Sequence, residues 1–471
     1  MEVLTSYDAS PHLYYGGGSR TQVSHLPNDI VIDILSRLPV KPLMQFKSVC
    51  KKWLSLIKHD TQLIDLHCIR SKSRPKLLYI NPLPEKGVLH TCLDVSFSAS
   101  KTLQQSISCA EIVEGSGGEE DAIINKVRIT DDQWFLYNQI LEPVNGLVPF
   151  IDLKTYAIKV YNASTREETP WVKSTLVAEE NAKLANKDST MKIKSLCSPI
   201  YRFGFDPEKK EHKVFCFWRL VARRESHRYN SKQRPDYESW EALTMGHDTK
   251  WRRINAVPNE NNQIKIQQAL PPANSSMRNV YADGTIYWSN KEDYWDVFSD
   301  SNPDDPDVIV AFDVGSEKYR VIPIPNFILN EPRDETFRKP IGMLALGRHV
   351  ALVYRIEPYV VKLWMLDDGA AKKLENCRGN RSNWIAETIT LPFCCDDGFG
   401  CFGIAGSTDK IIFESPGFED SVSVVDLYSY DRRNMTCMKI EMDGVASFTE
   451  HSERSILTTF TESLFPVLHK S

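Results

Sequence analysis

Several sequence features that would assign a function directly are missing from this 471-residue chain. It contains no Gly-x-Ser-x-Gly, His-Glu-x-x-His or Walker pattern, so the common marks of hydrolases, metalloproteases and nucleotide-binding enzymes are absent. No apolar stretch approaches the roughly eighteen residues that a membrane-spanning helix needs. The 57 lysines and arginines face 62 aspartates and glutamates, and the resulting charge of −5 gives no general attraction to nucleic acid. Catalysis, membrane insertion and nucleic-acid binding are therefore not predicted.

Signs of secretion are also missing. Residues 1–23 have no basic region followed by an apolar core, so we expect a disordered leader and no secretory signal. The four Asn-x-Ser/Thr sequences, at Asn162, Asn274, Asn380 and Asn434, are then expected to be chance matches. The eleven cysteines are odd in number and scattered, which favours reduced thiols over a disulfide framework. Together these features indicate a cytoplasmic or nuclear protein.

The most informative segment spans residues 26–57 and predicts three short helices. Three apolar groups recur there at helical spacing: Ile30, Val31, Ile34, Leu35 and Leu38; Leu43, Phe46 and Val49; and Trp53 with Leu56 or Ile57. Pro39 ends the first helix, and residues 60–73 are expected to add one more helix or turn. About forty residues bury too little apolar surface to fold alone, and the segment has neither a disulfide pair nor metal-ligand spacing. A partner protein is the remaining explanation for so much apolar surface.

Three sequence elements of this segment resemble the F-box: Leu26-Pro27, Leu38-Pro39-Val40-Lys41 and Val49-Cys50-Lys51-Lys52-Trp53. The resemblance implies docking to the Skp-type adaptor of a cullin ubiquitin ligase. The implied adaptor-binding residues are Leu26, Pro27, Ile34, Leu35, Leu38, Pro39, Val49, Cys50 and Trp53. Within this segment Trp53, Phe46 and Leu35 should mainly hold the helices together, whereas Leu26, Pro27, Pro39 and Val49 should face the adaptor. The alternative is a helical cap folded onto its own domain.

After a boundary near Ser73 the sequence changes to short β-rich runs separated by turns rich in Gly, Asp, Asn and Pro. A repeated pattern consists of a strand ending in Asn or Asp, a few polar residues and a return strand; it occurs at Asn162, Asp206, Asp313 and Asp431. So many hairpins over about four hundred residues favour radial repetition, and we expect a β-propeller of about six to eight blades. The predicted fold class is α+β multidomain: an F-box over residues 24–70, then an all-β propeller-like domain over residues 75–465.

Two further elements resemble the F-box-associated domain of plant F-box proteins, which is kelch-like. They are Tyr161-Asn162-Ala163-Ser164-Thr165-Arg166-Glu167 and Phe203-Gly204-Phe205-Asp206-Pro207, the latter followed by His212-Lys213-Val214. The chain departs from that domain mildly, since Val144, Tyr161 and Ala163 stand where Cys, Trp and Pro are usual. The resemblance is far more specific for architecture than for the target protein.

Three residue groups could suggest a cofactor or metal, and each has a simpler explanation. Residues 398–403 match the glycine fingerprint of dinucleotide sites, but a strand and not a helix is expected to follow. Cys394, Cys395 and Cys401 are of a type that binds zinc, yet no second ligand pair accompanies them, so structural thiols are favoured. The aspartates of residues 300–307 lack the spacing of a calcium loop. No cofactor and no metal are predicted.

Two kinds of loop are expected on the β domain. Arg223, Arg224, Arg228 and Tyr229 combine positive charge with an aromatic ring, a composition that grips phosphate or an acidic partner, and form the candidate target-binding loop. Residues 114–121 and 175–194 look like insertions, and both are expected to be exposed loops.

The sequence therefore predicts the substrate-recognition subunit of an SCF (Skp-cullin-F-box) ubiquitin ligase, without catalysis of its own. Its expected partners are a Skp-type adaptor, a cullin held indirectly and an unidentified target protein marked for ubiquitination and proteasomal degradation. One alternative is a propeller enzyme, which would need paired carboxylates or a metal in the central channel. Another is a propeller binding module that acts independently of the F-box.

Overall fold

A computed structural model describes residues 26–82, 88–95, 107–108, 125–130, 137, 139–179, 195–196, 199–221, 237–246, 248, 250–255, 279–290, 307–331, 342–366, 384–395, 400–403, 407, 409–419, 422–440, 448–449 and 456–467. Within these residues no helix is both long and apolar enough to cross a membrane. The predicted leader at residues 1–23 and the glycine-rich insertion at residues 114–121 lie outside the described residues.

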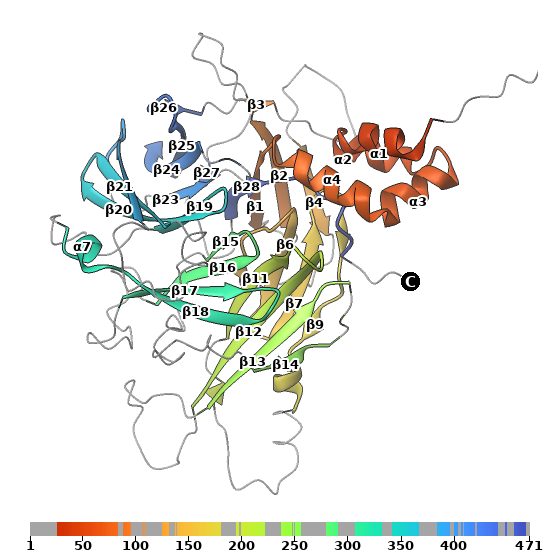
Figure 1. Ribbon diagram of the computed structural model, residues 1–471, viewed down its shortest axis with the longest axis horizontal. Coiled ribbons are helices and arrows are strands. Elements are labelled where there is room, and N and C mark those ends of the chain that lie inside the picture. The colour runs from red at the N-terminus through yellow and green to blue at the C-terminus, as the bar shows by residue number, and fades with distance from the viewer. Residues whose placement is uncertain are drawn as a thin grey trace, which may run out of the picture.

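Four helices form a compact unit at the start of the described chain (Figure 1). They are α1 (Asn28–Ser36), α2 (Val40–Phe46), α3 (Lys51–His59) and α4 (Thr61–Ser71). Asp60 starts α4, because its Oδ1 accepts a hydrogen bond from the amide of Leu63 at 2.8 Å. Cys50 starts α3, where its Sγ accepts the Trp53 amide at 3.5 Å. The three predicted short helices are confirmed, and the segment after Asp60 is a fourth helix.

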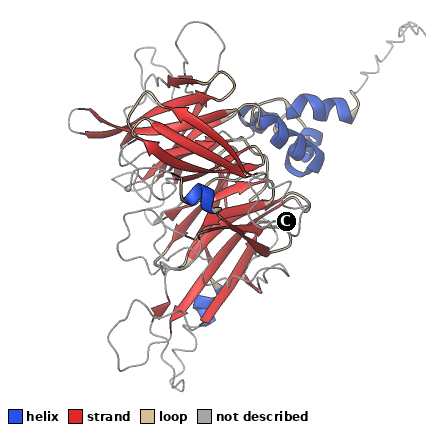
Figure 2. Cartoon of the chain, turned by 60° about the vertical axis from the view of Figure 1, so that its left-hand side comes forward, coloured by secondary structure: helices blue, strands red, loops and turns tan. Residues whose placement is uncertain are grey.

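The β domain consists, over the described residues, of six antiparallel sheets (Figures 1 and 2). The first sheet contains β28 (Ile456–Phe460), β1 (Lys76–Pro82), β2 (Val88–Val95), β3 (Ile107–Ser108) and β4 (Asn125–Thr130); the second contains β5 (Gln139–Ile140), β6 (Leu147–Asp152), β7 (Ala157–Asn162), β8 (Glu167–Glu168) and β9 (Val172–Lys173); the third contains β10 (Ser195–Leu196), β11 (Ile200–Asp206), β12 (Glu211–Val221), β13 (Tyr237–Thr244) and β14 (Arg252–Ile254). The fourth contains β15 (Val280–Ala282), β16 (Thr285–Ser289), β17 (Val308–Asp313) and β18 (Lys318–Pro323), followed by the short helix α7 (Asn326–Leu329); the fifth contains β19 (Gly342–Leu346), β20 (His349–Glu357), β21 (Val360–Leu366) and β22 (Trp384–Thr390); the sixth contains β23 (Gly400–Gly403), β24 (Lys410–Glu419), β25 (Val422–Asp431), β26 (Thr436–Lys439) and β27 (Phe448–Thr449).

The last strand closes the ring of sheets. β28 pairs with β1, with Phe460 opposite Lys76, so the end of the β domain completes the sheet with which it begins. Closure of this kind hides the open edge that a linear series of sheets would expose. The predicted order, a small helical unit followed by an all-β propeller, is confirmed.

One turn recurs in five hairpins and explains the repeated pattern of the sequence. At the β11–β12 turn, Asp206 Oδ1 accepts the amides of Glu208 at 3.0 Å and Lys209 at 3.1 Å, and Lys210 then has a left-handed φ of 60°. The same aspartate or asparagine, followed four residues later by a left-handed residue, occurs in the pairs Asp152 and Tyr156, Asn162 and Arg166, Asp313 and Glu317, and Asp431 and Met435. The predicted hairpins at Asn162, Asp206, Asp313 and Asp431 are confirmed.

The core of the β domain lies between neighbouring sheets. Phe215 and Phe217 of the third sheet contact Phe312 of the fourth edge to face, with ring centroids 4.6 and 6.0 Å apart. Several strands are buried on both faces, β7 and β11 along their whole length. Their apolar residues are nevertheless interrupted by polar ones, Lys159 and Asn162 in β7 and Arg202 and Asp206 in β11, and these four side chains are buried as well.

The expectation that residues 175–194 form an exposed loop is wrong for its first part. Residues 175–179 are helical, and Leu176 is only 1% exposed. The Leu176 amide donates to Glu241 Oε1 at 2.8 Å, and Glu241 Oε2 also accepts from Ser174 and from the Trp218 indole. These hydrogen bonds to the buried Glu241 carboxylate hold residues 174–176 against the third sheet. The charged sequence of residues 175–194 gave no sign of this contact.

Candidate functional site

Helix α1 has apolar side chains on two faces. Val31 and Leu35 point into the protein, where Leu35 is 1% exposed. Leu26, Ile30 and Ile34, spaced four residues apart, are 56%, 44% and 47% exposed. Side chains four residues apart share one face of a helix, so α1 and the residues leading into it present an apolar stripe to solvent.

The connection between α2 and α3 adds a second exposed apolar position. Val49 is 60% exposed, and Cys50 beside it is also exposed. Behind them Phe46 and Trp53 pack with ring centroids 5.2 Å apart, which fixes the angle between α2 and α3. The exposed apolar side chains of α1 and of the α2–α3 connection therefore lie on helices that are fixed by packing behind them.

This concentration of exposed apolar side chains is specific to the helical unit. Among the residues that the structure describes, eight large apolar side chains are exposed, and five of them belong to residues 26–71: Leu26, Ile30, Ile34, Val49 and Ile69. Exposed apolar groups gathered on so few residues mark an interaction surface. We call Leu26, Ile30, Ile34 and Val49 the exposed apolar set.

The structure places the nine residues of the predicted adaptor site at different depths. Leu26, Pro27, Ile34, Val49 and Cys50 are exposed, while Leu38, Pro39 and Trp53 are half-buried. Leu35 is buried between the helices, where it was expected to hold them together, so it presents no surface to a partner in this arrangement. The prediction missed Ile30, although its spacing of four residues from both Leu26 and Ile34 was visible in the sequence.

Charged groups fix α1 against α4. Asp33 accepts hydrogen bonds from Arg37 at 3.1 and 3.2 Å, and from Arg70 of α4 at 2.5 Å. The hydrogen bonds from Arg37 and then Arg70 hold the pKa of the Asp33 carboxyl below its usual value. Arg70 Nη1 also donates to the Asp33 carbonyl at 2.7 Å. The helix that carries the apolar stripe is thus held in place by its polar side.

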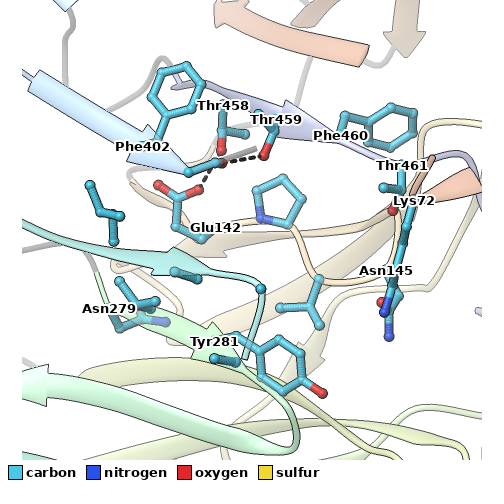
Figure 3. A pocket seen from close by; sticks show the side chains of 18 of the residues that line it. Lys72, Glu142, Asn145, Asn279, Tyr281, Phe402, Thr458, Thr459, Phe460 and Thr461 are labelled. Atoms are coloured by element: carbon cyan, nitrogen blue, oxygen red, sulfur yellow. Dashed lines mark hydrogen bonds between the residues drawn. The ribbon is translucent and has the colours of Figure 1, made fainter. Parts of the chain in front are cut away.

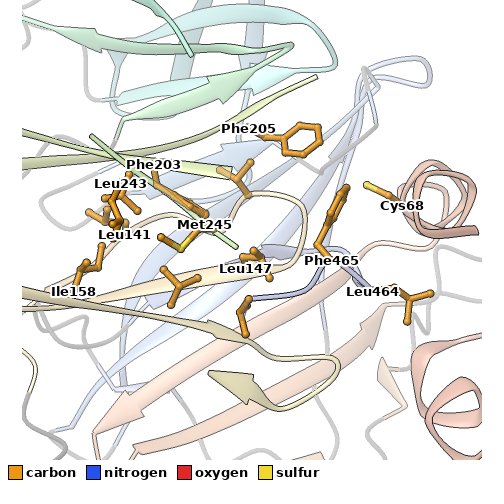
Figure 4. Packing of buried hydrophobic residues seen from close by; sticks show 14 of the residues in the cluster. Cys68, Leu141, Leu147, Ile158, Phe203, Phe205, Leu243, Met245, Leu464 and Phe465 are labelled. Carbon is orange, nitrogen blue, oxygen red and sulfur yellow. The ribbon is translucent and has the colours of Figure 1, made fainter. Parts of the chain in front are cut away.

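The inner faces of the helices pack on the β domain. The alternative prediction, a helical cap folded onto its own domain, is therefore correct in part. The Val40 amide donates to Glu462 Oε2 at 3.1 Å, and Lys76 pairs with the other oxygen of Glu462 at 3.1 Å. Figure 4 shows Cys68 of α4 facing Phe465, and one buried apolar cluster runs from the helices into the β domain. The chain itself thus covers part of the apolar surface for which the sequence argument required a partner, and a partner need cover only the outer part.

A buried histidine lies at this junction. His67 of α4 is fully buried, and its Nε2 lies 3.1 Å from the Leu38 carbonyl, to which a neutral imidazole donates. Burial lowers the pKa of His67 below its usual value. The Ser71 hydroxyl lies 3.3 Å from the other ring nitrogen. Both nitrogens are therefore used within the helical unit.

The residues weighed for cofactors and metals are placed as parts of sheets. Gly400–Gly403, part of the glycine fingerprint, form β23, and the strand expected to follow is β24, with residues 404–406 outside the described residues. A Cβ at Gly403 would lie 1.8 Å from the Ala345 carbonyl oxygen. Only glycine permits that close approach of two inner strands. Cys395 is buried and Cys401 partly buried in one apolar cluster. Over the described residues no group of three His, Cys, Asp or Glu side chains could hold a metal ion.

The candidate target-binding loop cannot be placed. Arg223, Arg224, Arg228 and Tyr229 lie outside the described residues, as do residues 300–306 of the acidic loop. Their assignment stays a prediction from the sequence.

Two family models match the chain: an F-box domain over residues 23–64 and an F-box associated beta propeller domain over residues 95–464. The chain is an F-box protein with an F-box-associated β-propeller. Its relatives include F-box protein At4g19940 of Arabidopsis thaliana, which is 27% identical over 446 residues, covering 90% of this chain and 88% of that protein. F-box protein At5g65850 of the same plant is 24% identical over 440 residues, covering 90% and 86%. Both family resemblances predicted from the sequence are confirmed.

Among solved structures, a chain of a nidogen/laminin complex aligns with 83% of this F-box protein and 99% of its own length. The identity is 11% and the TM-score is 0.34, values too low to bear on fold or function.

Proposed function

We propose that this F-box protein is the substrate receptor of an SCF ubiquitin ligase and acts in the cytoplasm or nucleus. The exposed apolar set of the helical unit binds a Skp-type adaptor, and loops of the propeller hold a target protein. The concentration of exposed apolar side chains in residues 26–71, inside the segment matched by the F-box model, is the observation that carries the proposal. In this proposal the partner proteins carry out the ubiquitin transfer, and this chain positions the target.

The adaptor part of the proposal follows from the geometry of α1 and of the α2–α3 connection. Ile34 is exposed on α1, whose Leu35 is buried, and Val49 is exposed in the connection between α2 and α3, beside the packed rings of Phe46 and Trp53. Burying such side chains against a complementary partner removes apolar area from water without reordering the helices. We therefore expect these side chains to contribute to affinity far more than to folding.

The test measures adaptor binding by isothermal titration calorimetry with a purified Skp-type adaptor and the full chain. Ile34→Ser and Val49→Ser should each weaken binding by about tenfold, and the double variant by about a hundredfold. Ile385→Ser is the matched control, because Ile385 is 56% exposed but lies on β22 of the propeller. Leu26→Ala combined with Pro27→Ala should likewise abolish adaptor binding and leave propeller unfolding unchanged.

Equal adaptor affinity for the wild type and the Ile34→Ser, Val49→Ser double variant would overturn the adaptor assignment. The target part is tested separately in plant cells with the proteasome blocked, by comparing proteins that copurify with the full chain and with the double variant. A target should remain with both forms, whereas adaptor and cullin should be lost from the variant. Reversing the charge of Arg223 and Arg224 should release the target but not the adaptor, and retention of the target would exclude that loop.

A further inference from the structure

Inner strands of the propeller meet at its centre and leave little space between them. β15, β19, β23 and β28 surround a cavity of about 190 Å³ (Figure 3). Beside it Thr459 Oγ1 of β28 donates to the Gly403 carbonyl of β23 at 3.1 Å, and Gly403 also lies against Ala345 of β19. A further strand would have to lie about 4.8 Å from its neighbour along its whole length. These inner strands leave no room for one, so we examined the outer edges of the sheets.

Most outer edges carry features that prevent pairing with another chain. Over the described residues β3, β8, β9, β14 and β27 have only two or three residues, while β4 carries Lys126 and Arg128, β18 carries Lys318 and Arg320, and β26 carries Lys439. Short edge strands and basic side chains are common protections of a sheet edge. The outer strand β22 (Trp384–Thr390) has seven residues, contains no lysine, arginine or proline, and pairs with β21 without a bulge. It therefore lacks the protections of the other described outer strands.

The pairing of β22 shows which of its backbone groups point outward. The Leu391 amide, just after β22, donates to the Tyr359 carbonyl at 2.8 Å and so points toward β21. Backbone groups alternate in direction along a strand, so the amides of Ala386, Thr388 and Thr390 point away from β21. Within the described part of the chain, β21 is the strand with which β22 pairs, and these three amides have no other hydrogen bond. The outer edge of β22 thus offers a row of donors with the carbonyls of the same residues.

Exposed apolar side chains of the propeller gather around this edge. Outside the helical unit, the exposed large apolar side chains of the described residues are Tyr359, Ile385 and Met435. Ile385 lies near the start of β22, and Tyr359 is bonded to the residue that follows its end. Met435 lies in the β25–β26 turn, whose Arg432 donates to Glu387 of β22 at 2.9 Å. Apolar groups gathered in this way mark an interaction surface.

The backbone row and the apolar side chains define the occupant. An extended protein segment matches the spacing of the donors and carbonyls of an open strand edge. Ile385 and Tyr359 stand near opposite ends of β22, a span of about 20 Å at about 3.4 Å per residue, so a segment of about seven residues with an apolar side chain near each end fits. A second copy of this chain fits less well. Pairing β22 with itself about its centre sets Glu387 opposite Glu387, and like charges directly opposite destabilise a sheet.

We propose that the outer edge of β22 binds an extended segment of the target protein by β-strand addition. Backbone hydrogen bonds supply the affinity, and Ile385 and Tyr359 favour apolar residues at the two ends of the segment. The inference rests on the proposed receptor function, because it names how the target is held. It is separate from adaptor binding, since β22 belongs to the fifth sheet and the exposed apolar set to the helical unit.

The experiment uses the purified full chain and a fluorescent peptide, Lys-Ile-Thr-Val-Thr-Val-Thr-Ile-Lys. Alternate amides of the peptide are N-methylated, which leaves one edge free to pair and prevents the peptide from stacking on itself. Fluorescence anisotropy measures the affinity, and hydrogen exchange with mass spectrometry locates the site. The peptide should bind and should slow exchange in residues 384–390. The same peptide with both edges methylated is the control and should not bind.

Variants of β22 separate the backbone from the side chains. Thr388→Pro removes one outward amide and leaves the pairing with β21 in place, so it should weaken peptide binding by about tenfold or more. Thr388→Ala is the matched control, because it keeps the amide at the same exposed position and should bind as the wild type does. Ile385→Ser should weaken binding by about tenfold and keeps the test valid where Thr388→Pro fails to fold.

Adaptor titrations distinguish a failure of this site from a failure of the receptor function. The Ile34→Ser, Val49→Ser double variant should lose the adaptor and keep the peptide, whereas Ile385→Ser should lose peptide affinity and keep the adaptor. Three results would overturn the proposal: no binding of the free-edge peptide up to its solubility limit, slowed exchange only outside residues 384–390, or unchanged peptide affinity in Ile385→Ser. A dimer of the chain that Thr388→Pro dissociates in light scattering would also overturn it, by assigning the edge to a second copy.

Discussion

Asn162 offers the sharpest test of how the propeller is held together. Its side chain is fully buried and makes four hydrogen bonds. Oδ1 accepts the amides of Ser164 at 2.9 Å and Thr165 at 3.2 Å, which builds the turn after β7. Nδ2 donates to the carbonyls of Ser463 at 3.1 Å and Phe465 at 3.0 Å, which fixes the C-terminal segment. One residue therefore serves a local turn and a contact across three hundred positions of sequence.

The expected cost of Asn162→Ala separates into these two parts. Loss of the turn bonds costs about 1 kcal/mol, because water can reach part of the turn. Loss of the two bonds to the C-terminal segment leaves buried carbonyls unpaired and costs about 2–4 kcal/mol more. Asp431→Ala is the matched control, since Asp431 Oδ1 accepts two amides in the same kind of turn, at 3.0 and 3.2 Å. Among the described residues its side chain makes hydrogen bonds only within that turn.

Urea unfolding followed by tryptophan fluorescence measures both variants. We expect about 3–5 kcal/mol for Asn162→Ala and about 1 kcal/mol for Asp431→Ala. Asn162→Asp keeps the turn acceptors but sets a carboxylate against two carbonyls, so it should lose most of the stability that the alanine variant loses. If Asn162→Ala costs no more than Asp431→Ala, the C-terminal contact does not stabilise the fold and the reasoning is refuted.

Three further predictions concern single residues of the propeller. Met435 is 78% exposed at a left-handed φ of 52°, so Met435→Gly should stabilise the protein by about 0.5–1 kcal/mol in thermal unfolding; a lower midpoint would contradict this. Burial lowers the pKa of His212 to about 3, so the unfolded chain binds its proton first, and stability should fall by about 1 kcal/mol per pH unit from pH 6.5 toward 3. His212→Gln should flatten that slope, and an unchanged slope would exclude His212 as its cause. Glu241→Gln replaces one of the two oxygens that accept from Ser174, Leu176 and Trp218, and should cost about 2–4 kcal/mol in urea unfolding, whereas a neutral effect would show that the buried charge is not required.

The features that the sequence revealed are those encoded locally. Asp206 and the left-handed Lys210 lie four residues apart, so one short window carries the whole turn. The same is true of the helical spacing that predicted α1 and of Pro39 at its end. Hairpins of this kind could be recognised one at a time, but their number per sheet depends on strands that pair across long separations, such as β28 with β1.

The features that the sequence did not reveal depend on distant residues. Glu241 looks like one more charged residue in β13, and its role appears only when Ser174, 67 positions away, meets it. Leu176 is buried for the same reason. Val40 and Glu462 are separated by 422 positions, so no local pattern shows that the helices rest on their own β domain.

The C-terminal segment connects the two halves of the proposed function. Glu462 binds both the first residue of α2 and Lys76 at the start of β1, while Phe465 packs near Cys68 of α4 and accepts a bond from Asn162. Between α4 and β1 the chain has only residues 72–75 as a connection, which alone would leave the helices free to turn. The shared contacts of residues 461–467 remove that freedom. Under the proposed function, a receptor built this way would hold its target at a fixed angle to the adaptor, and a fixed geometry would raise the effective concentration of the target at the transfer site more than a free hinge could.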